Sequence, residues 1–288
     1  MCVIWGIPYL LIRVAIREIS PPTLVFARTA PAALLLIPLA LHRGQLRPLL
    51  AQWRWVVVYT VVELAIPWLL LSRAEQHLTS SVAGLLIASV PLISALLYRA
   101  SRNTEPLDRR RLLGLVIGFA GVAALVGIDA EGTNIVAVAE VGVCALGYSL
   151  GPLIISRRLA DLPGLGVVAA SVALVAVGYA PVALTHLPPD LSAEVIGSVA
   201  VLAFICTALA FVLFFQLIVE VGPARATVIT YVNPAIAIVL GVTLLSEPFT
   251  VGIAVGFPLI LVGSVLATRR STTGGVGKPD LTLDPPAR

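Results

Sequence analysis

The chain is a succession of apolar runs, each roughly 20 residues long, with short polar breaks between them. A run of this length crosses the hydrocarbon core of a bilayer as an α-helix. The runs are continuous and do not alternate apolar with polar residues, which disfavours a transmembrane β-barrel. The sequence therefore predicts an all-α membrane protein with ten transmembrane helices, at 2–17, 22–41, 54–72, 79–98, 111–128, 134–155, 163–184, 195–219, 223–245 and 249–268.

The composition agrees with a bilayer as the solvent. Of the 288 residues, 59% are hydrophobic and 12% are charged, whereas a soluble domain carries about 25% charged residues. The net charge of +4 does not indicate a nucleic-acid partner, because the arginines sit in short gaps and form no continuous basic face. The three cysteines are far apart and lack metal-ligand spacing, so we expect neither a metal site nor a cofactor.

The two ends of the chain differ in character. The first apolar run, 2–17, has no basic segment before it, so we expect a retained helix and not a cleaved signal peptide. Whether the natural start lies upstream of Met1 stays open at this point. The last segment, 269–288, is rich in Gly, Pro and Thr, and we expect it to be a disordered cytoplasmic tail.

The arginines between the runs predict the orientation in the membrane. Thirteen lie in the gaps after the second, fourth, sixth and eighth runs and at the C-terminal junction, against two in the opposite gaps. Cytoplasmic loops carry the excess of positive charge. Both termini are therefore predicted to face the cytoplasm, in a multi-pass protein of the cytoplasmic membrane.

One phrase is written twice, about 140 residues apart. In each copy a Glu-Pro pair is followed by a glycine nine residues after the glutamate and another sixteen residues after it: Glu105, Gly114 and Gly121 in the first, and Glu247, Gly256 and Gly263 in the second. We expect the two glutamates to be structural turn or cap residues. Five helices per copy place the copies in opposite orientations. We therefore predict two inverted five-helix repeats, at 1–128 and 134–268.

Two longer stretches of the chain resemble a known family. They are "WGIPYLLIRVAIREISPPTLVFARTAPAALLL", from Trp5, and "GPARATVITYVNPAIAIVLGVTLLSEPFTVGIAVGFPLILVGSVLA", from Gly222. The chain resembles EamA-family permeases of the drug/metabolite transporter superfamily. The resemblance implies a ten-helix inner-membrane carrier, most often an exporter of amino acids, metabolites or toxic compounds.

Ionisable residues inside the apolar runs are the first site candidates, because charges in a membrane are costly and mark function. They are Glu63, Glu140 and Arg28, with Arg13 as a weaker candidate that can reach outward. Two interpretations stay open. Arg28 pairs with Glu63 or Glu140 and fixes helix packing, or a carboxylate lines a cavity and binds a cationic substrate group or a coupling proton.

Aromatic, amide and proline residues at mid-depth complete the candidate site. We expect substrate contacts from Trp5, Tyr9, Trp68, Tyr148, Tyr231 and Asn233, with ordinary packing as the alternative for each. Pro91 and Pro234 stand at matching places in the two repeats and are hinge candidates, with inherited packing kinks as the alternative.

The sequence contains one pattern that resembles an enzyme motif. "GYSLG", from Gly147, matches the nucleophile elbow G-x-S-x-G, but it lies inside a spanning helix and not at a strand–helix turn. No nucleotide-binding or HExxH motif occurs, so we expect a gradient-driven transporter and not an enzyme. The same fold would serve an uptake permease or a non-transporting sensor or assembly protein. Glycine pairs such as Gly114 with Gly118 suit internal packing or a homodimer. Substrate, direction and coupling ion stay open.

Overall fold

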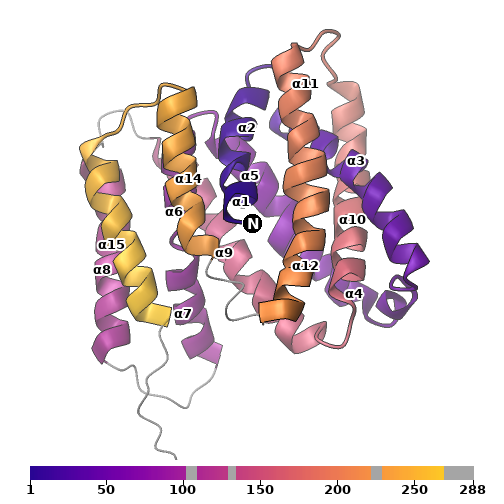
Figure 1. The fold of residues 1–288 in the computed structure, drawn as a ribbon, viewed down its shortest axis with the longest axis horizontal. Helices are drawn as coiled ribbons and strands as arrows, with labels where there is room; N and C mark the ends of the chain where they lie inside the picture. Colours follow the sequence, from indigo (N-terminus) through magenta and orange to yellow (C-terminus); the bar gives the residue numbers. More distant parts are fainter. Residues whose placement is uncertain (102–108, 129–133, 222–228, 269–288) are drawn as a thin grey trace, which may run out of the picture.

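The computed structural model of the chain describes residues 1–101, 109–128, 134–221 and 229–268 (Figure 1). Within these ranges the regular elements are helices, and no strand occurs. The first half contains α1 (Cys2–Gly6), α2 (Pro8–Ala15), α3 (Pro21–His42), η1 (Arg47–Gln52), α4 (Trp53–Tyr59), η2 (Thr60–Ala65), α5 (Ile66–Ala74), α6 (Ser80–Ile87), α7 (Val90–Ser101) and α8 (Arg109–Ile128). The second half contains α9 (Ile135–Arg158), α10 (Gly164–Thr185), α11 (Ala193–Ala200), η3 (Val201–Leu209), α12 (Ala210–Val221), α14 (Ile229–Leu244) and α15 (Val251–Thr268).

Eight helical stretches in the described part of the chain are long and apolar enough to cross a membrane. They are Pro21–His42, Arg47–Ala74, Ser80–Leu97, Arg109–Ile128, Ile135–Arg158, Gly164–Thr185, Ala193–Ile218 and Val251–Thr268. Two further apolar helices, Cys2–Ala15 and Tyr231–Leu244, are shorter. The structure is therefore that of a helical, multi-pass membrane protein, while the count of ten spans remains a prediction.

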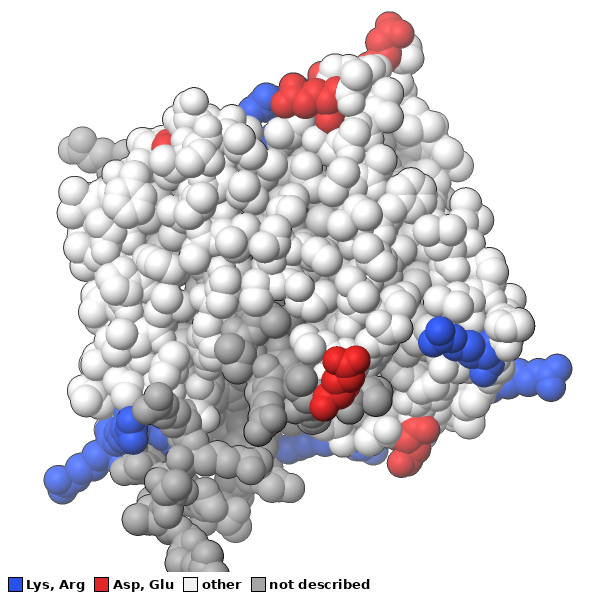
Figure 2. Space-filling model, in the orientation of Figure 1, with Lys and Arg blue, Asp and Glu red and all other residues white. Residues whose placement is uncertain are grey.

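The surface has the polarity of a protein that faces lipid. On the face seen in Figure 2, charged side chains lie toward the two ends of the bundle and its middle is uncharged. Apolar side chains such as Leu34 and Val177 are 76% and 71% exposed. Met1 lies at mid-height of the bundle (Figure 1), so the sides of the two termini remain predictions. The predicted tail, 269–288, and Glu105 lie outside the described residues.

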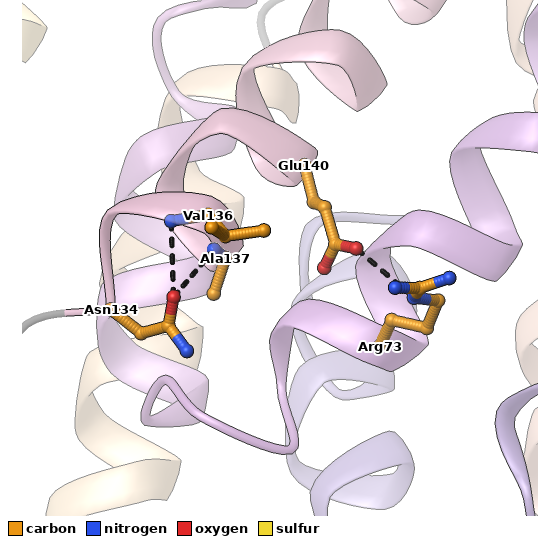
Figure 3. Close-up of polar contacts among 5 residues, drawn as sticks. All are labelled: Arg73, Asn134, Val136, Ala137 and Glu140. Atoms are coloured by element: carbon orange, nitrogen blue, oxygen red, sulfur yellow. Dashed lines mark hydrogen bonds and ion pairs between the residues drawn. The ribbon is translucent and has the colours of Figure 1, made fainter.

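Side-chain caps explain where several helices begin. The Asn134 side-chain oxygen accepts hydrogen bonds from the main-chain nitrogens of Val136 and Ala137, at 3.0 and 3.2 Å (Figure 3). Such caps replace acceptors that the first turn of a helix lacks. The starts of α3, α6 and α11 are capped in the same way, by Ser20, Thr79 and Ser192. The predicted runs that begin at 22, 79, 134 and 195 therefore start within two residues of the observed helices.

The glycines of the repeated phrase form the contact between α8 and α15. A Cβ atom on Gly114 would lie 2.6 Å from the Ala267 nitrogen, and one on Gly121 would lie 3.0 Å from the Gly256 oxygen. Earlier residues of α8 thus face later residues of α15, so the two helices run antiparallel. A larger side chain would push them apart. Of the two roles considered for these glycines, the structure shows internal packing, since Gly118 also faces Leu92 of α7; a homodimer stays a prediction.

Other helix pairs connect the two halves. Helix α3 packs on α10, α6 packs on α14, and η2 with α5 packs on α9, while α11 packs on α2. The π-helical segment η2 also contacts α10, and the π-helical segment η3 contacts α3. These contacts occur in matching pairs: η2 contacts α10 as η3 contacts α3, and α5 packs on α9 as α11 packs on α2.

The interior consists of two large apolar cores. One is built around α2, α6, α9 and α14, and the other around α3, α5 and α10. Tyr148 of α9 packs against both cores. Tyr148 therefore lies where the two cores meet.

Candidate functional site

Glu63 lies on the π-helical segment η2, pressed against α9. A Cβ atom on Gly151 would lie 2.5 Å from the Glu63 carboxyl carbon, so only a glycine leaves room for this carboxyl group. Gly147, one turn earlier, faces the main chain at Val62. The Glu63 Oε2 atom is buried and has no hydrogen-bond partner among the described residues. The two glycines of "GYSLG" thus lack the side chains that would prevent η2, with Glu63, from packing closely on α9.

The serine of the same motif has a structural partner. Helix 79–98 of the sequence prediction is interrupted between α6 and α7, at Ala88 and Ser89. The Ser149 hydroxyl donates to the Val90 carbonyl at 3.1 Å, and the Ser264 hydroxyl donates to the Ala88 carbonyl at 3.3 Å. Both hydroxyls satisfy acceptors near the interruption, which membrane-buried main chain requires. Ser149 therefore acts in packing and has no nucleophile-elbow context.

Arg28 is the buried cation of the interior. Its side chain is 5% exposed, and its guanidinium carbon lies 4.0 Å from the ring centroid of Trp68. Its Nη2 donates a hydrogen bond to the Thr207 hydroxyl at 3.1 Å. Among the described residues, Arg28 forms no ion pair with Glu63 or Glu140. The aromatic face and the hydroxyl therefore stabilise the cation, which leaves its charge available to an anionic group.

Glu140 has a different partner from the one considered in the sequence. Its Oε1 lies 3.0 Å from Nε of Arg73, so the pair joins α9 to the end of α5 (Figure 3). The Glu140 side chain is 13% exposed and that of Arg73 is 54% exposed. Glu140 is thus a neutralised acid near the end of the bundle.

Five of the predicted residues come together inside the protein, and we call them the central cluster: Tyr9, Arg28, Glu63, Trp68 and Tyr148. Tyr148 interacts electrostatically with Tyr9, Arg28 and Glu63. Tyr9 and Trp68 are each 7% exposed. The cluster combines one cation, one acid with a free acceptor, and three aromatic faces. Such a set suits a small solute that carries charged and apolar parts.

The remaining predicted residues lie outside the central cluster. Trp5 packs in aromatic contacts with Phe211 and Phe214, at centroid distances of 6.0 and 4.8 Å. The Tyr231 hydroxyl is hydrogen-bonded to the Thr268 hydroxyl at 2.7 Å. Asn233 presents its main-chain oxygen to Gly6, where α14 packs on α1.

The two hinge candidates differ in their surroundings. Pro91 is the second residue of α7 and directly follows the interruption between α6 and α7. Pro234 lies inside α14, which continues through it. The hinge role of both residues stays a prediction.

Glu247 explains one copy of the Glu-Pro motif. Its carboxylate accepts hydrogen bonds from the main-chain nitrogens of Ser80 and Ser81, at 2.7 and 3.0 Å, and from the Ser81 hydroxyl at 2.6 Å. It therefore binds the positive N-terminus of α6, where an acid is favourable. This confirms the expected cap role for Glu247. The same expectation for Glu105 falls outside the described residues.

A cavity of about 360 Å³ opens beside this cap. It is lined by Arg13, Ile16, Arg17, Gln76, Thr79, Leu245 and Glu247. The guanidinium of Arg13 also donates to the main-chain carbonyl of Glu75. The cavity therefore lies next to a residue that the sequence did not single out.

Glu75 is the functional candidate that sequence reasoning missed. It directly follows α5, in the polar break "SRAEQH", where a glutamate ordinarily faces water. In the folded protein it is 0% exposed. Burial raises the pKa of its carboxyl well above the ordinary value; Arg13 counteracts the rise, Glu247 adds to it, and Arg28 counteracts it. The available signal was the adjacent pattern of Ala74 and Leu78, both core residues, which continues the apolar face past the end of the run.

One family model matches almost the whole chain, and the relatives found by comparison are named as transporters. The EamA-like transporter family matches residues 1–127 and 140–269 of this chain. The chain is 28% identical over 255 residues to "Uncharacterized inner membrane transporter YedA" of Escherichia coli (strain K12), covering 85% of this chain and 80% of that protein. It is 24% identical over 279 residues to "Uncharacterized transporter YvbV" of Bacillus subtilis (strain 168), covering 94% and 90%.

More distant likenesses extend over almost the whole chain. An "Uncharacterized transporter" of Archaeoglobus fulgidus is 23% identical over 274 residues, which cover 92% of this chain and 95% of that protein. A solved crystal structure with 23% identity superposes with a TM-score of 0.65 and covers 93% of this chain and 94% of that one. The last comparison shows a shared fold.

Proposed function

Because the chain belongs to the EamA-like transporter family, we propose that it is a secondary transporter that exports small organic solutes across the cytoplasmic membrane. Amino acids, metabolites and drug-like compounds are the substrate class. The relatives are all named as transporters, which supports this choice over an enzyme, a sensor or an assembly protein.

The central cluster is the observation that carries the proposal. Arg28 comes from α3, Glu63 and Trp68 come from η2 and α5, and Tyr148 comes from α9 in the second half. Thr207, the hydrogen-bond partner of Arg28, also comes from the second half. A binding site between two halves changes its accessibility when one half rocks against the other, which is the basis of alternating access.

The pairing of helices supports two inverted five-helix repeats. Antiparallel α8 and α15 meet through the matched glycines, Gly114 opposite Gly263 and Gly121 opposite Gly256. The contacts between elements also keep their form when the halves are exchanged. Halves inserted in opposite senses would have this symmetry, so the contacts support the proposed repeats.

Two polar contacts at equivalent places support the same symmetry. Arg28 and Ser171 each lie seven residues after the first residue of a 22-residue helix, α3 and α10. Arg28 reaches Thr207 in η3, and the Ser171 hydroxyl accepts from Thr60 in η2 at 2.8 Å. Each π-helical segment is thus hydrogen-bonded to a helix of the other half, η3 to α3 and η2 to α10.

The π-helical segments are the proposed moving parts, together with the interruption before Pro91. A π-helix departs from the regular hydrogen-bond pattern and is frequently found at functional sites. Segment η2 contributes Glu63 to the central cluster, and η3 contributes Thr207, which accepts a hydrogen bond from Arg28 of the cluster. Ten spans, cytoplasmic termini and proton coupling complete the proposal.

The test compares extracellular metabolites of cells that contain equal membrane amounts of wild type or of single variants. We expect one solute class to accumulate outside with wild type. Glu63→Gln should lower that export by about tenfold or more, because loss of one charged contact costs about 1.4 kcal/mol or more. Glu140→Gln is the matched control and should retain export, because Arg73 already neutralises Glu140.

Three outcomes would contradict the proposal. Accumulation of the solute inside the cells would make the protein an uptake permease. Equal extracellular metabolite profiles for cells with wild type and cells without the protein would favour a sensor or an assembly role. Equal losses in Glu63→Gln and Glu140→Gln would show that the central cluster is not the selective site.

A further inference from the structure

Glu75 is a buried acid without a hydrogen-bond donor. It is 0% exposed, and neither of its carboxylate oxygens has a partner among the described residues. The nearby guanidinium of Arg13 donates to the main-chain carbonyl of Glu75 and not to its carboxylate. An ionised carboxylate removed from water without donors is strongly unfavourable. In this conformation Glu75 is therefore a neutral carboxylic acid that holds a proton.

The charged and titratable groups around Glu75 come from several elements. Arg13 and Tyr9 face it from α2, Arg28 from α3, and Cys144 from α9, while Glu247 faces it from the segment before α15. Two of these groups are cations and one is an anion that is already bound to the N-terminus of α6. The cations are close enough to stabilise the carboxylate once the proton leaves.

A cavity lies beside this acid, although Glu75 itself does not line it. The cavity of about 360 Å³ is lined by Gln76, which is the next residue after Glu75. Arg13 lines the same cavity and contacts the Glu75 carbonyl. A shift of the Arg13 side chain would therefore connect the carboxyl group with water in the cavity.

We propose that Glu75 is the proton-binding site of this transporter, loaded from the cavity that Arg13 and Glu247 line, an inference that rests on the proposed transport function. The carboxylate accepts one proton from hydronium in the cavity, which becomes water, and the neutral acid later returns the proton to water as hydronium. Only an O–H bond forms and breaks.

Arg28 connects the proton site with the central cluster. It interacts electrostatically with Glu75 and also contacts Trp68 and Thr207. When Glu75 loses its proton, the carboxylate attracts Arg28 away from the neutral acceptors of the cluster. Protonation thus changes the charge that a solute meets, and so couples proton movement to solute movement.

Infrared spectroscopy tests the proton site without any solute. Purified wild type in detergent should show the C=O stretch of a protonated carboxylic acid at neutral pH. Glu75→Gln should lose one such band. Glu63→Gln is the matched control at the other buried acid, and it should retain the band that Glu75→Gln loses. If Glu75→Gln does not fold, Glu75→Asp should shift the band. An unchanged band in the Glu75 variant overturns the proposal.

Transport in proteoliposomes tests the coupling. The probe is the solute that wild-type cells accumulate outside, driven either by a pH gradient or by exchange against the same solute. Glu75→Gln should lose pH-driven transport at least tenfold and retain exchange. Wild-type pH dependence in Glu75→Gln overturns the coupling. If wild type moves no solute, the proposed function fails, and the infrared result still decides the proton site.

Discussion

The guanidinium carbon of Arg28 lies 4.0 Å from the ring centroid of Trp68, and both side chains are buried. In a membrane interior this contact takes the place of an ion pair for the cation. Within the described part of the chain it also leaves Arg28 without an ion-pair partner, although Glu63 lies in the same cluster. The site thus keeps a positive charge that an anionic solute group or Glu75 can use.

The Arg28–Trp68 contact should contribute measurably to stability. A double-mutant cycle with Arg28→Met and Trp68→Leu should give a coupling energy of about 2 kcal/mol, because the pair is desolvated. Thermal unfolding in detergent measures it. The exposed pair Arg158 and Trp55, at 4.5 Å, is the control and should give about 0.5–1 kcal/mol. Equal coupling in the two cycles would contradict this account.

The glycine contact between α8 and α15 should not tolerate a methyl group. Gly114→Ala places a Cβ atom 2.6 Å from the main-chain nitrogen of Ala267, so we expect a loss of about 1–3 kcal/mol in the free energy of unfolding. Gly127→Ala, in the same helix, meets no atom within 4 Å and should stabilise by about 0.4–1 kcal/mol. A loss at Gly127 as large as at Gly114 would contradict the packing account, because alanine at an open helical position favours the helix.

The carboxylate of Glu247 should be important for anchoring α6. Glu247→Ala leaves the main-chain nitrogens of Ser80 and Ser81 without their acceptor, and we expect a cost of about 1–3 kcal/mol. Hydrogen exchange at the start of α6 should rise in this variant. Glu194→Gln is the control, because its exposed ion pair with Arg17 is 3.9 Å long and is worth less than about 1 kcal/mol. Unchanged exchange in α6 would argue against the anchor.

Glu75 predicts how stability depends on pH. Its carboxyl pKa is raised in the folded protein, mainly by burial, so the folded state binds more protons than the unfolded state between the two pKa values. The stabilisation that Glu75 adds to the free energy of unfolding is therefore fully present below the pKa of the unfolded state. It is lost as pH rises through the pKa of the folded state. Thermal unfolding of Glu75→Gln should show a weaker decline of stability over this window than wild type does. Parallel curves for the two proteins would rule out the raised pKa.

Part of the site could be predicted from the sequence. Arg28, Glu63, Trp68, Tyr9 and Tyr148 stood out because charged or amphipathic groups at mid-depth of an apolar run are costly. The structure brings these five together. Glu140, which was also predicted, instead forms an ion pair with Arg73. Their partners were not predictable, because Thr207 lies 179 residues from Arg28 in the chain.

Glu75 shows the opposite case. A glutamate in a polar break between two helices usually faces water, so the sequence places it in a loop. It is buried only because α2, α3 and α9 and the segment at Glu247 close around the end of α5. The π-helical segments also have no sequence signal, since η2 and η3 read as ordinary apolar helix.

The sequence alone determined that this chain consists of membrane helices, where most of them start, and that a motif of glycines recurs at fixed spacing. These properties are local, because apolar length and capping residues act within one segment. Only the tertiary structure decided which ionisable groups are neutralised and which are not. That outcome depends on contacts between distant helices and on access to water, and neither is written in any single stretch of the chain.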